Sequence, residues 1–491
     1  MLETPTYTIV IAPIAAAGVC ALGAGPRVAE YANLAASIVC LIAAILLAYG
    51  VGEPTTMMSD YVLVDAFGTW TLVCTALVYC FASIYAIGYM RLLTEHHDRL
   101  PKFYALFALF AATMIAGPLM NNIGVYWIAI ELTTLVSTFL VGFERDEEAI
   151  EAAWKYIIVV SAGISLALLG TVLFYWAGSL VIGPTYDATW ATLRHAAPQM
   201  NPALTRMAFL LVLVGYGTKA GLAPMHTWLP DAHSEGPAPV SAMLSGALLN
   251  TAMLGIARYL TITDAAGLPG IPRTVLVAIG AFSLLVAALF IVKQQGIKRL
   301  MAYSSVEHMG VLALGLGFGG PLAIAAVLYH MLNHSLAKSL MFFGAGNVMR
   351  VFGTKRIDEI RGVWQRFPTT GMLWLAGAVA ITGAPPFGLF LSELTLMRAG
   401  FATPNAWAVV VLMLLLIVIF VGFLNHFRAM FMDDRPVPQV QAPHPAIHAS
   451  MWMTAPMWFA LIPIFVLGVW WPAGLWHFFT KVAADLGGAG K

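Results

Sequence analysis

The chain has 491 residues, of which 60% are hydrophobic and 10% are charged, and its formal net charge is +1. This composition excludes an ordinary soluble globular domain, in which roughly a quarter of the residues are charged. It indicates an integral membrane protein that crosses the bilayer many times. The net charge is uninformative, so the positions of the charged residues carry the argument.

Apolar stretches of about 20 residues can cross roughly 30 Å of hydrocarbon as helices, and the chain contains about fourteen of them. They lack the alternating pattern of barrel strands, so helices must satisfy the backbone groups in lipid. The sequence therefore predicts an all-α integral membrane protein. The expected spans lie near 6–23, 31–51, 64–90, 102–120, 123–143, 155–178, 206–229, 237–262, 274–292, 300–319, 321–349, 368–397, 406–432 and 452–475.

Alternate loops differ in their content of basic residues, and this difference orients the chain. By the positive-inside rule the richer side is cytoplasmic, so both termini are predicted to be non-cytoplasmic, in the inner membrane of a prokaryotic cell. The first span has no basic segment before it and no clear cleavage site, which predicts a retained span. The basic residues of the predicted cytoplasmic side are Arg27, Arg91, Arg99, Lys102, Arg145, Lys293, Lys298, Arg299, Arg350, Lys355, Arg356, Arg361, Arg366, Arg428 and Arg435.

Two expected spans are interrupted by proline: Pro224 in the segment 215–243, and Pro385 with Pro386 in the segment 381–397. Paired interruptions point to transporter repeats with broken helices that line a hydrated cavity. The alternative is that proline only kinks two ordinary helices. The sequence predicts two inverted five-helix repeats, each with a broken helix, at 101–265 and 266–435, between N-terminal helices at 1–100 and a C-terminal helix at 436–491.

Glu131 and Lys219 lie within apolar stretches, where an ionisable group is costly unless it is paired or hydrated. Lys219 directly precedes the first break. Desolvation favours the neutral form of each side chain, whereas an opposite charge favours the ionised form. A buried Glu–Lys pair whose separation changes therefore takes up and releases a proton. The alternative for Glu131 is a structural carboxyl group bonded to neighbouring Thr or Ser side chains.

His330, His334 and Lys338 follow an i, i+4, i+8 spacing, which places them on one helical face over about 12 Å. Histidine both donates and accepts hydrogen bonds near neutral pH, so the stripe suits a proton relay that ends at a lysine. Glu393, after the second break, is the expected far terminal. The alternatives are a structural stripe, a metal site that lacks an evident third ligand and, for Glu393, an exposed carboxylate at a helix end.

Further titratable residues complete the predicted path. Glu307 and His308 are adjacent within one expected span, so they face different sides of the helix and could join separate water chains. His226 flanks the first break as a relay member or a loop cap. Lys155 lies where a loop enters a span, as an accessory residue or as an interfacial lysine whose ammonium group reaches the surface.

No redox or metal centre is visible in the sequence. The four cysteines form no CxxC pair, and no Walker A loop or dinucleotide-binding GxGxxG unit occurs. No cofactor and no metal are therefore expected in this chain. Energy for transport would come from a gradient or from a partner.

Five motifs between about 100 and 435 carry a family resemblance: IELTTL, KAGLAPMHTWLPDAHSEGPAPVSAML, IKRLMAYSSVEHMG, HMLNHSLAKSLMFF and GAPPFGLFLSE. The chain resembles the antiporter-like proton-translocating membrane subunits shared by respiratory complex I, Mrp-type cation/proton antiporters and membrane-bound hydrogenases. The VEHMG and TTL stretches look most like the hydrogenase-4 component F branch. The resemblance implies that Glu131 and Lys219 form a coupling pair. It also implies that His330, His334 and Lys338 continue a central hydrophilic axis, and that Glu393 is the terminal exchange residue.

One position departs from the family pattern. Asn250 stands approximately where complex I relatives often carry a lysine or a histidine. An amide cannot carry a proton charge, so water or Glu307 is expected to replace this station.

The residues and the resemblance predict a proton-translocating membrane subunit of a multisubunit oxidoreductase, similar to hydrogenase-4 and formate hydrogenlyase or to NADH:quinone oxidoreductase. Expected partners are membrane lipid, other membrane subunits and a peripheral redox arm with iron–sulfur and nickel–iron hydrogenase subunits, but no nucleic acid. Whether the chain is itself an enzyme is left open. The alternatives are a subunit of an Mrp-type sodium/proton antiporter and the membrane subunit of an inorganic-carbon uptake complex.

Overall fold

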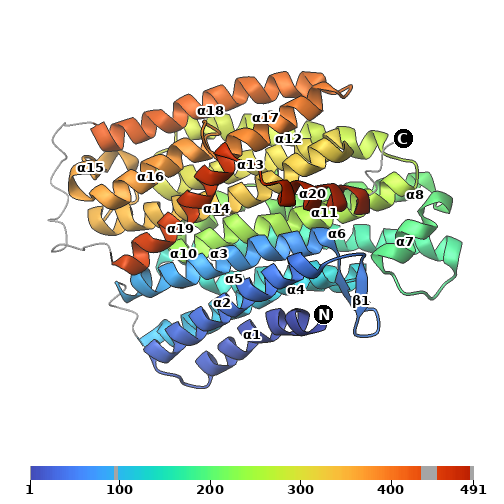
Figure 1. Cartoon of the computed structure of the whole chain (residues 1–491), viewed down its shortest axis with the longest axis horizontal. Coiled ribbons are helices and arrows are strands. Elements are labelled where there is room, and N and C mark those ends of the chain that lie inside the picture. Colours follow the sequence, from blue (N-terminus) through green and yellow to red (C-terminus); the bar gives the residue numbers. More distant parts are fainter. Residues whose placement is uncertain (1, 93–97, 433–449, 487–491) are drawn as a thin grey trace.

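The computed structural model describes residues 2–92, 98–432 and 450–486, and within these ranges the protein is almost entirely helical (Figure 1). Eleven of the described helices are long and apolar enough to cross a membrane. The predicted fold class, an all-helical integral membrane protein, is thereby confirmed.

The N-terminal part contains a small hairpin that the all-helical prediction did not include. Its two strands, of three residues each, pair antiparallel between the second and third helices. The elements of this part are α1 (Glu3–Ala21), α2 (Pro26–Gly50), β1 (Thr55–Met57), β2 (Val62–Val64), α3 (Ala66–Arg91), α4 (Leu100–Leu119) and α5 (Ile123–Val141).

The middle part contains the first break, which separates α8 from α9. Its first helix, α6, begins before the expected span, where Asp146 caps it by accepting a hydrogen bond from the backbone N–H of Ala149 at 2.6 Å. The elements are α6 (Glu147–Ile182), α7 (Trp190–Ala196), η2 (Ala197–Gln199), α8 (Pro202–Ala220), α9 (Trp228–Glu235), α10 (Ala238–Met243), the π-helical turn η3 (Leu244–Leu248) and α11 (Leu249–Ala265).

The last part contains the second break, which separates α16 from α17. Three of the expected spans are not among the eleven helices that are long and apolar enough to cross a membrane. They correspond to α13, to α14 and to the broken pair α16 and α17, which are too polar or, taken singly, too short to be counted. The elements are α12 (Gly270–Val292), α13 (Ile297–Phe318), α14 (Gly320–Phe352), η4 (Ile357–Glu359), α15 (Val363–Arg366), α16 (Pro368–Ile381), α17 (Gly388–Phe401), α18 (Ala406–Met432), α19 (Met451–Val469) and α20 (Ala473–Asp485).

The core of the bundle lies around α10, α11, α13 and α14. Every residue of α14 from Ala323 to Val348 is buried, although this stretch carries two histidines and a lysine. By contrast, α1 and α2 at the lower edge of Figure 1 and α18 at its upper edge expose many large apolar side chains. The most polar long helices are therefore the innermost ones, which is the arrangement expected of a hydrophilic path through a membrane protein.

The loops that carry the expected cytoplasmic cations lie together at one end of the bundle, which we call the basic end. Lys355 pairs with Glu148 at 3.2 Å and with Glu235 at 2.5 Å, and Arg350 pairs with Glu144 at 3.4 Å. Burial alone would lower the pKa of Lys355, but its hydrogen bonds and charge interactions with Glu235 and Glu148 raise that pKa above its ordinary value. This end lies at the left of Figure 1, with α15, opposite α7 and the hairpin. Residues 433–449, including Arg435, lie outside the described residues.

Candidate functional site

Glu131 on α5 and Lys219 on α8 are joined through a third side chain, Thr134. The Lys219 Nζ donates to Thr134 Oγ1 at 2.8 Å, and the Thr134 hydroxyl donates to Glu131 Oε2 at 3.4 Å. Ser161 on α6 donates to the other carboxylate oxygen, Oε1, at 2.7 Å. Lys219 is completely buried and Glu131 is half-buried. These four residues and Tyr156 are called the lysine–glutamate cluster. Its two charges are bridged by a hydroxyl group.

Tyr156 on α6 provides the second acceptor for Lys219. Nζ donates to the Tyr156 hydroxyl at 3.0 Å and lies 5.3 Å from the ring centroid. The same hydroxyl lies 2.7 Å from Ser137 Oγ, whose own hydrogen is donated to the carbonyl of Thr133. We therefore assign Tyr156 as the donor toward Ser137 and as an acceptor from Lys219. Two acceptors hold the lysine in place as an ammonium or as an amine, because even the amine has two N–H donors.

Side chains form hydrogen bonds with the backbone groups that the break after Lys219 leaves without helical partners. Gly221 follows α8 with a φ of +76°, a left-handed conformation that glycine adopts without strain. Trp228 Nε1 donates to the carbonyl of Thr218 at 2.8 Å, and the backbone N–H of Ala223 donates to Ser283 Oγ at 2.9 Å. The predicted break is confirmed. It leaves Lys219 in the last turn of a helix, where the helix dipole favours a cation.

A second cluster, called the histidine cluster, forms where α13, α14 and α17 meet. Its members are Glu307, His308, His330, His334, Lys338, Ser392 and Glu393. His308 Nδ1 lies 3.1 Å from His330 Nε2, and His330 Nδ1 lies 2.9 Å from Ser392 Oγ. The hydrogen of Ser392 is donated to the carbonyl of Leu389 at 2.7 Å. We therefore assign His330 Nδ1 as the donor to Ser392 and His330 Nε2 as the acceptor from His308. The two buried rings share a hydrogen bond through which a proton can pass.

Lys338 lies two turns along α14 from His330 and reaches to α13. Its Nζ donates to the carbonyl of Met301 at 2.9 Å and to the hydroxyl of Ser304. Lys338 and both stripe histidines are completely buried. The His334 ring lies 5.3 Å from the His308 ring, between centroids. The predicted stripe therefore faces the protein interior rather than lipid.

Glu307 is 1% exposed, and neither of its carboxylate oxygens has a hydrogen-bond partner among the described residues. The titratable groups that interact with it electrostatically are Glu393 and Lys338. The structure thus brings Glu307 together with the predicted stripe and with its expected far terminal.

Glu393 on α17 packs against the second break. It is 3% exposed, so the alternative of an exposed carboxylate at a helix end is wrong. A Cβ atom on Gly383 would lie 2.1 Å from Glu393 Oε2, and Gly383 has a φ of +67°. Only glycine leaves room for this carboxylate, so the broken backbone itself forms part of the cluster.

The histidine cluster also contains a set of metal-ligand atoms. One ligand atom from each of His308, His330 and Glu393 lies within 4.8 Å of the others, and all three side chains are buried. Imidazole nitrogen and carboxylate oxygen are ligands that zinc uses. The sequence indicated a His330–His334 pair without a third ligand, whereas the structure groups His330 with His308 and Glu393. The prediction that this chain holds no metal stays a prediction.

The accessory candidates occupy different environments. Lys155 is exposed and pairs with Glu151 at 2.6 Å and with Asp231 at 3.5 Å, at a polar surface cleft of about 310 Å³. It does not join the buried clusters. His226 lies in the first break and is 7% exposed, while His233 on α9 is completely buried.

Asn250 is the second residue of α11, which follows the π-helical turn η3, and it is completely buried. Its Nδ2 donates to Ser335 Oγ on α14 at 3.0 Å and to the carbonyl of Gly246 at 3.2 Å. The hydroxyls of Ser245 and Ser305, also buried, lie 2.8 Å apart and connect η3 to α13. Buried polar contacts therefore join η3 to α13 and α11 to α14, which are two of the three helices of the histidine cluster.

Several hydrogen-bonding residues of the two clusters had not been singled out from the sequence. Thr134 lies one helical turn after Glu131, which is a spacing visible in the sequence. The others lie on neighbouring helices, where no local pattern identifies them. The missed residues are Thr134, Tyr156, Ser161, Ser304 and Ser392.

Both clusters fall within the part of the chain that matches a known family. A family model described as "NADH:quinone oxidoreductase/Mrp antiporter, TM" matches residues 120–420. A hydrogenase-4 component F homolog of Methylacidiphilum infernorum is 44% identical over 283 residues, which cover 57% of this chain and 60% of that protein. This chain therefore matches less than two thirds of that relative.

Two further comparisons cover most of the chain. NADH-quinone oxidoreductase subunit N of Desulforudis audaxviator is 30% identical over 414 residues, which cover 83% of this chain and 80% of that protein. Among solved structures, a chain in the Mrp complex of Dietzia sp. DQ12-45-1b superposes with a TM-score of 0.86 at 20% identity, covering 99% of this chain and 97% of that chain. At that level of identity the structural match shows a shared fold.

Proposed function

The chain belongs to the NADH:quinone oxidoreductase/Mrp antiporter family, and from this premise we propose that it is a proton-translocating membrane subunit of a multisubunit oxidoreductase. The observation that carries the proposal is the pair of completely buried lysines, Lys219 and Lys338, each hydrogen-bonded to a hydroxyl group and each associated with a carboxylate. Buried ionisable groups are costly in a membrane and are retained for a function.

In the lysine–glutamate cluster, the hydroxyl of Thr134 connects Nζ of Lys219 to the Glu131 carboxylate, which are oppositely charged when Lys219 is protonated. A change in the distance between α5 and α8 would alter the stability of the two charges together, because each stabilises the other through this bridge. Moving one elementary charge across 100 mV corresponds to about 2.3 kcal/mol, which is comparable to the free energy of one charge-assisted hydrogen bond. Small helix movements are therefore sufficient to load and unload a proton here.

In the histidine cluster, the proton would pass from Lys338 through the imidazole rings to Glu393. Several atoms along this route have no hydrogen-bond partner among the described residues, including both ring nitrogens of His334 and Nε2 of His308. Buried polar atoms are normally satisfied by protein or by ordered water, so we expect water to complete the relay. Asn250 carries no proton in this scheme and orients Ser335 beside it.

The break at Gly383 is predicted to hold Glu393 in position for release of the proton. In Gly383→Ala, the added Cβ would displace the carboxylate, and we expect proton translocation to fall by about tenfold or more, since a misplaced proton-transfer group loses much of its contribution. The measurement is acidification by vesicles that contain the assembled complex.

Gly353→Ala is the matched control for this substitution. Gly353 also has a φ of +67°, but nothing lies within 4 Å of its Cβ position. Both variants should bear the same backbone strain of about 1 to 2 kcal/mol. Equal transport in the two variants would show that the Glu393 contact has no role in transport.

The finer assignments belong to the same proposal. We propose a hydrogenase-4-like complex, in which partner subunits carry iron–sulfur and nickel–iron centres and this chain carries no redox centre. The 44% identity to a component F homolog supports this choice. We place the chain in the inner membrane of a prokaryotic cell with the basic end in the cytoplasm and both termini on the other side.

To test the proposed function, the complex is purified by an affinity tag on this chain and reconstituted in sealed vesicles. Oxidation of its electron donor should drive proton movement that an uncoupler abolishes and that persists when sodium is replaced by potassium. Metal analysis of the same sample should find iron and nickel. Redox activity without proton movement would contradict the proposal.

The second candidate function is that of an Mrp-type sodium/proton antiporter, favoured by the structural match to the Mrp complex. A sodium requirement for proton movement, in a complex without redox metals, would establish it. Each carboxylate of the buried clusters is associated with a lysine or histidine side chain, and such basic neighbours favour protons over a sodium ion.

A further inference from the structure

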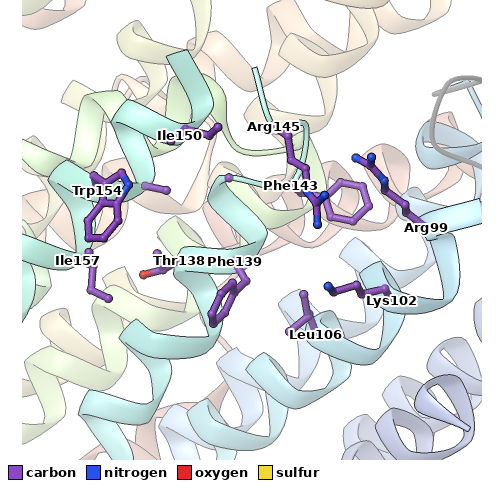
Figure 2. Close-up of a pocket in the computed structure, with 12 residues that line it drawn as sticks. Arg99, Lys102, Leu106, Thr138, Phe139, Phe143, Arg145, Ile150, Trp154 and Ile157 are labelled. Atoms are coloured by element: carbon purple, nitrogen blue, oxygen red, sulfur yellow. The ribbon is translucent and has the colours of Figure 1, made fainter. Parts of the chain in front are cut away.

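A pocket of about 430 Å³ opens between α4, α5 and α6 at the basic end (Figure 2). Its rim carries three cations: Arg99 before α4, Lys102 in the first turn of α4, and Arg145 in the turn between α5 and α6. Its wall is apolar and includes Phe139, which is 66% exposed, and Trp154, which is 63% exposed. The pocket is therefore an apolar surface groove with a cationic rim.

The three rim cations have no ion pair with any described residue. The acidic residues on either side of Arg145 are engaged elsewhere: Glu144 pairs with Arg350 at 3.4 Å, and Asp146 caps α6 by accepting from Ala149 N at 2.6 Å. Arg145 itself has a φ of +61°, a conformation that is unfavourable for a residue with a Cβ. The flanking contacts hold this strained turn, and Figure 2 shows the Arg145 side chain reaching toward the rim, near Phe143.

The rim of the pocket lies at the level where the headgroup of a membrane lipid is expected. The rim lies where α4 and α6 begin and where α5 ends, so it stands at the end of three membrane-spanning segments. Exposed tryptophan side chains such as Trp154 favour the interfacial layer of a bilayer. The apolar wall continues from this level along the lipid-facing side chains of α5 and α6, including Phe139 and Ile157.

We propose that this pocket binds one anionic phospholipid, with its phosphate headgroup between Arg99, Lys102 and Arg145 and an acyl chain along Phe139 and Trp154. Arginine and lysine on converging segments match a phosphate group, and basic pockets between transmembrane helices attract anionic lipids. A zwitterionic lipid satisfies the apolar wall but leaves the clustered positive charge uncompensated. A membrane helix from a partner subunit is the competing occupant, and it would need acidic side chains at this rim.

The test uses the full chain in its purified complex, reconstituted with brominated phosphatidylglycerol or brominated phosphatidylcholine at the same mole fraction. Bromine quenches the fluorescence of nearby tryptophan side chains. The difference in quenching between the wild type and Trp154→Phe measures lipid bound in the pocket. We expect preferential quenching by phosphatidylglycerol. We expect its apparent affinity to fall about fivefold for each of Arg99→Gln, Lys102→Gln and Arg145→Gln, since each basic residue near the surface contributes comparably.

Arg428→Gln is the matched control, because Arg428 lies on α18, outside the pocket, and should leave quenching unchanged. Arg145→Lys should retain most of the preference and so separates loss of charge from loss of folding. Equal quenching by both lipids would overturn the proposal. So would quenching that appears in the isolated chain but is absent from the complex, because a partner helix would then fill the pocket. Inorganic phosphate at millimolar concentration should not displace the lipid, and displacement would identify an anion site instead.

Discussion

Replacing Lys338 by Met is expected to reduce proton translocation by about 100-fold or more, the contribution typical of a positioned proton-transfer group. Lys338 is completely buried, and it is the only lysine in the histidine cluster. Methionine retains most of the length of the side chain, so packing changes little, whereas the amine that bonds to Met301 and Ser304 is lost. His330→Gln should have a smaller effect, because the neutral amide can keep the hydrogen bonds to His308 and Ser392. The measurement is the initial rate of vesicle acidification per assembled complex.

Lys298→Met is the matched control for Lys338→Met. Lys298 is also buried on α13, but its Nζ donates to the backbone carbonyls of Ser234 at 3.0 Å and Gly236 at 2.6 Å, which anchors the loop after α9. Its loss should lower the yield of assembled complex, while each complex that forms still translocates protons. If Lys338→Met transported protons at the wild-type rate, the histidine cluster would not be the path.

Glu131→Gln and Lys219→Ala are expected to abolish proton translocation while the complex still assembles, because each variant removes one member of the bridged charge pair. Thr134→Val tests the bridge itself. It removes the hydroxyl group that links Lys219 to Glu131 and leaves the two charges in place. A hydrogen bond to a charged group contributes about 1.5 to 3 kcal/mol, so transport should fall by roughly 10- to 100-fold.

Thr133→Val provides the control for Thr134→Val. Thr133 is buried on the same helix, but its hydroxyl donates only to the backbone carbonyl of Ile130 at 2.6 Å. The two valine variants change volume and polarity equally, and only one interrupts the bridge. Similar transport in both would mean that Lys219 and Glu131 communicate by another route.

The sequence by itself was sufficient for the class of protein, the approximate positions of the spans and the two breaks. Hydropathy and helix-breaking residues act locally, so a window of about 20 residues is enough to identify a span. Glu131, Lys219, Glu307 and Lys338 were singled out as candidates in the same way, because an ionisable residue inside an apolar stretch is conspicuous wherever the helix packs. The hairpin gave no such signal because its strands have only three residues each, and η3 gave none because its contact with α13 crosses between distant segments.

Only the tertiary structure decided which side chains meet. The sequence placed His330 and His334 together by their helical spacing, whereas packing of α13, α14 and α17 joins His330 to His308, Ser392 and Glu393. The bridge from Lys219 through Thr134 to Glu131 likewise crosses between helices whose residues are 85 positions apart. Periodicity specifies which face of a helix a residue occupies, but the neighbour on that face is set by side-chain packing across the whole bundle.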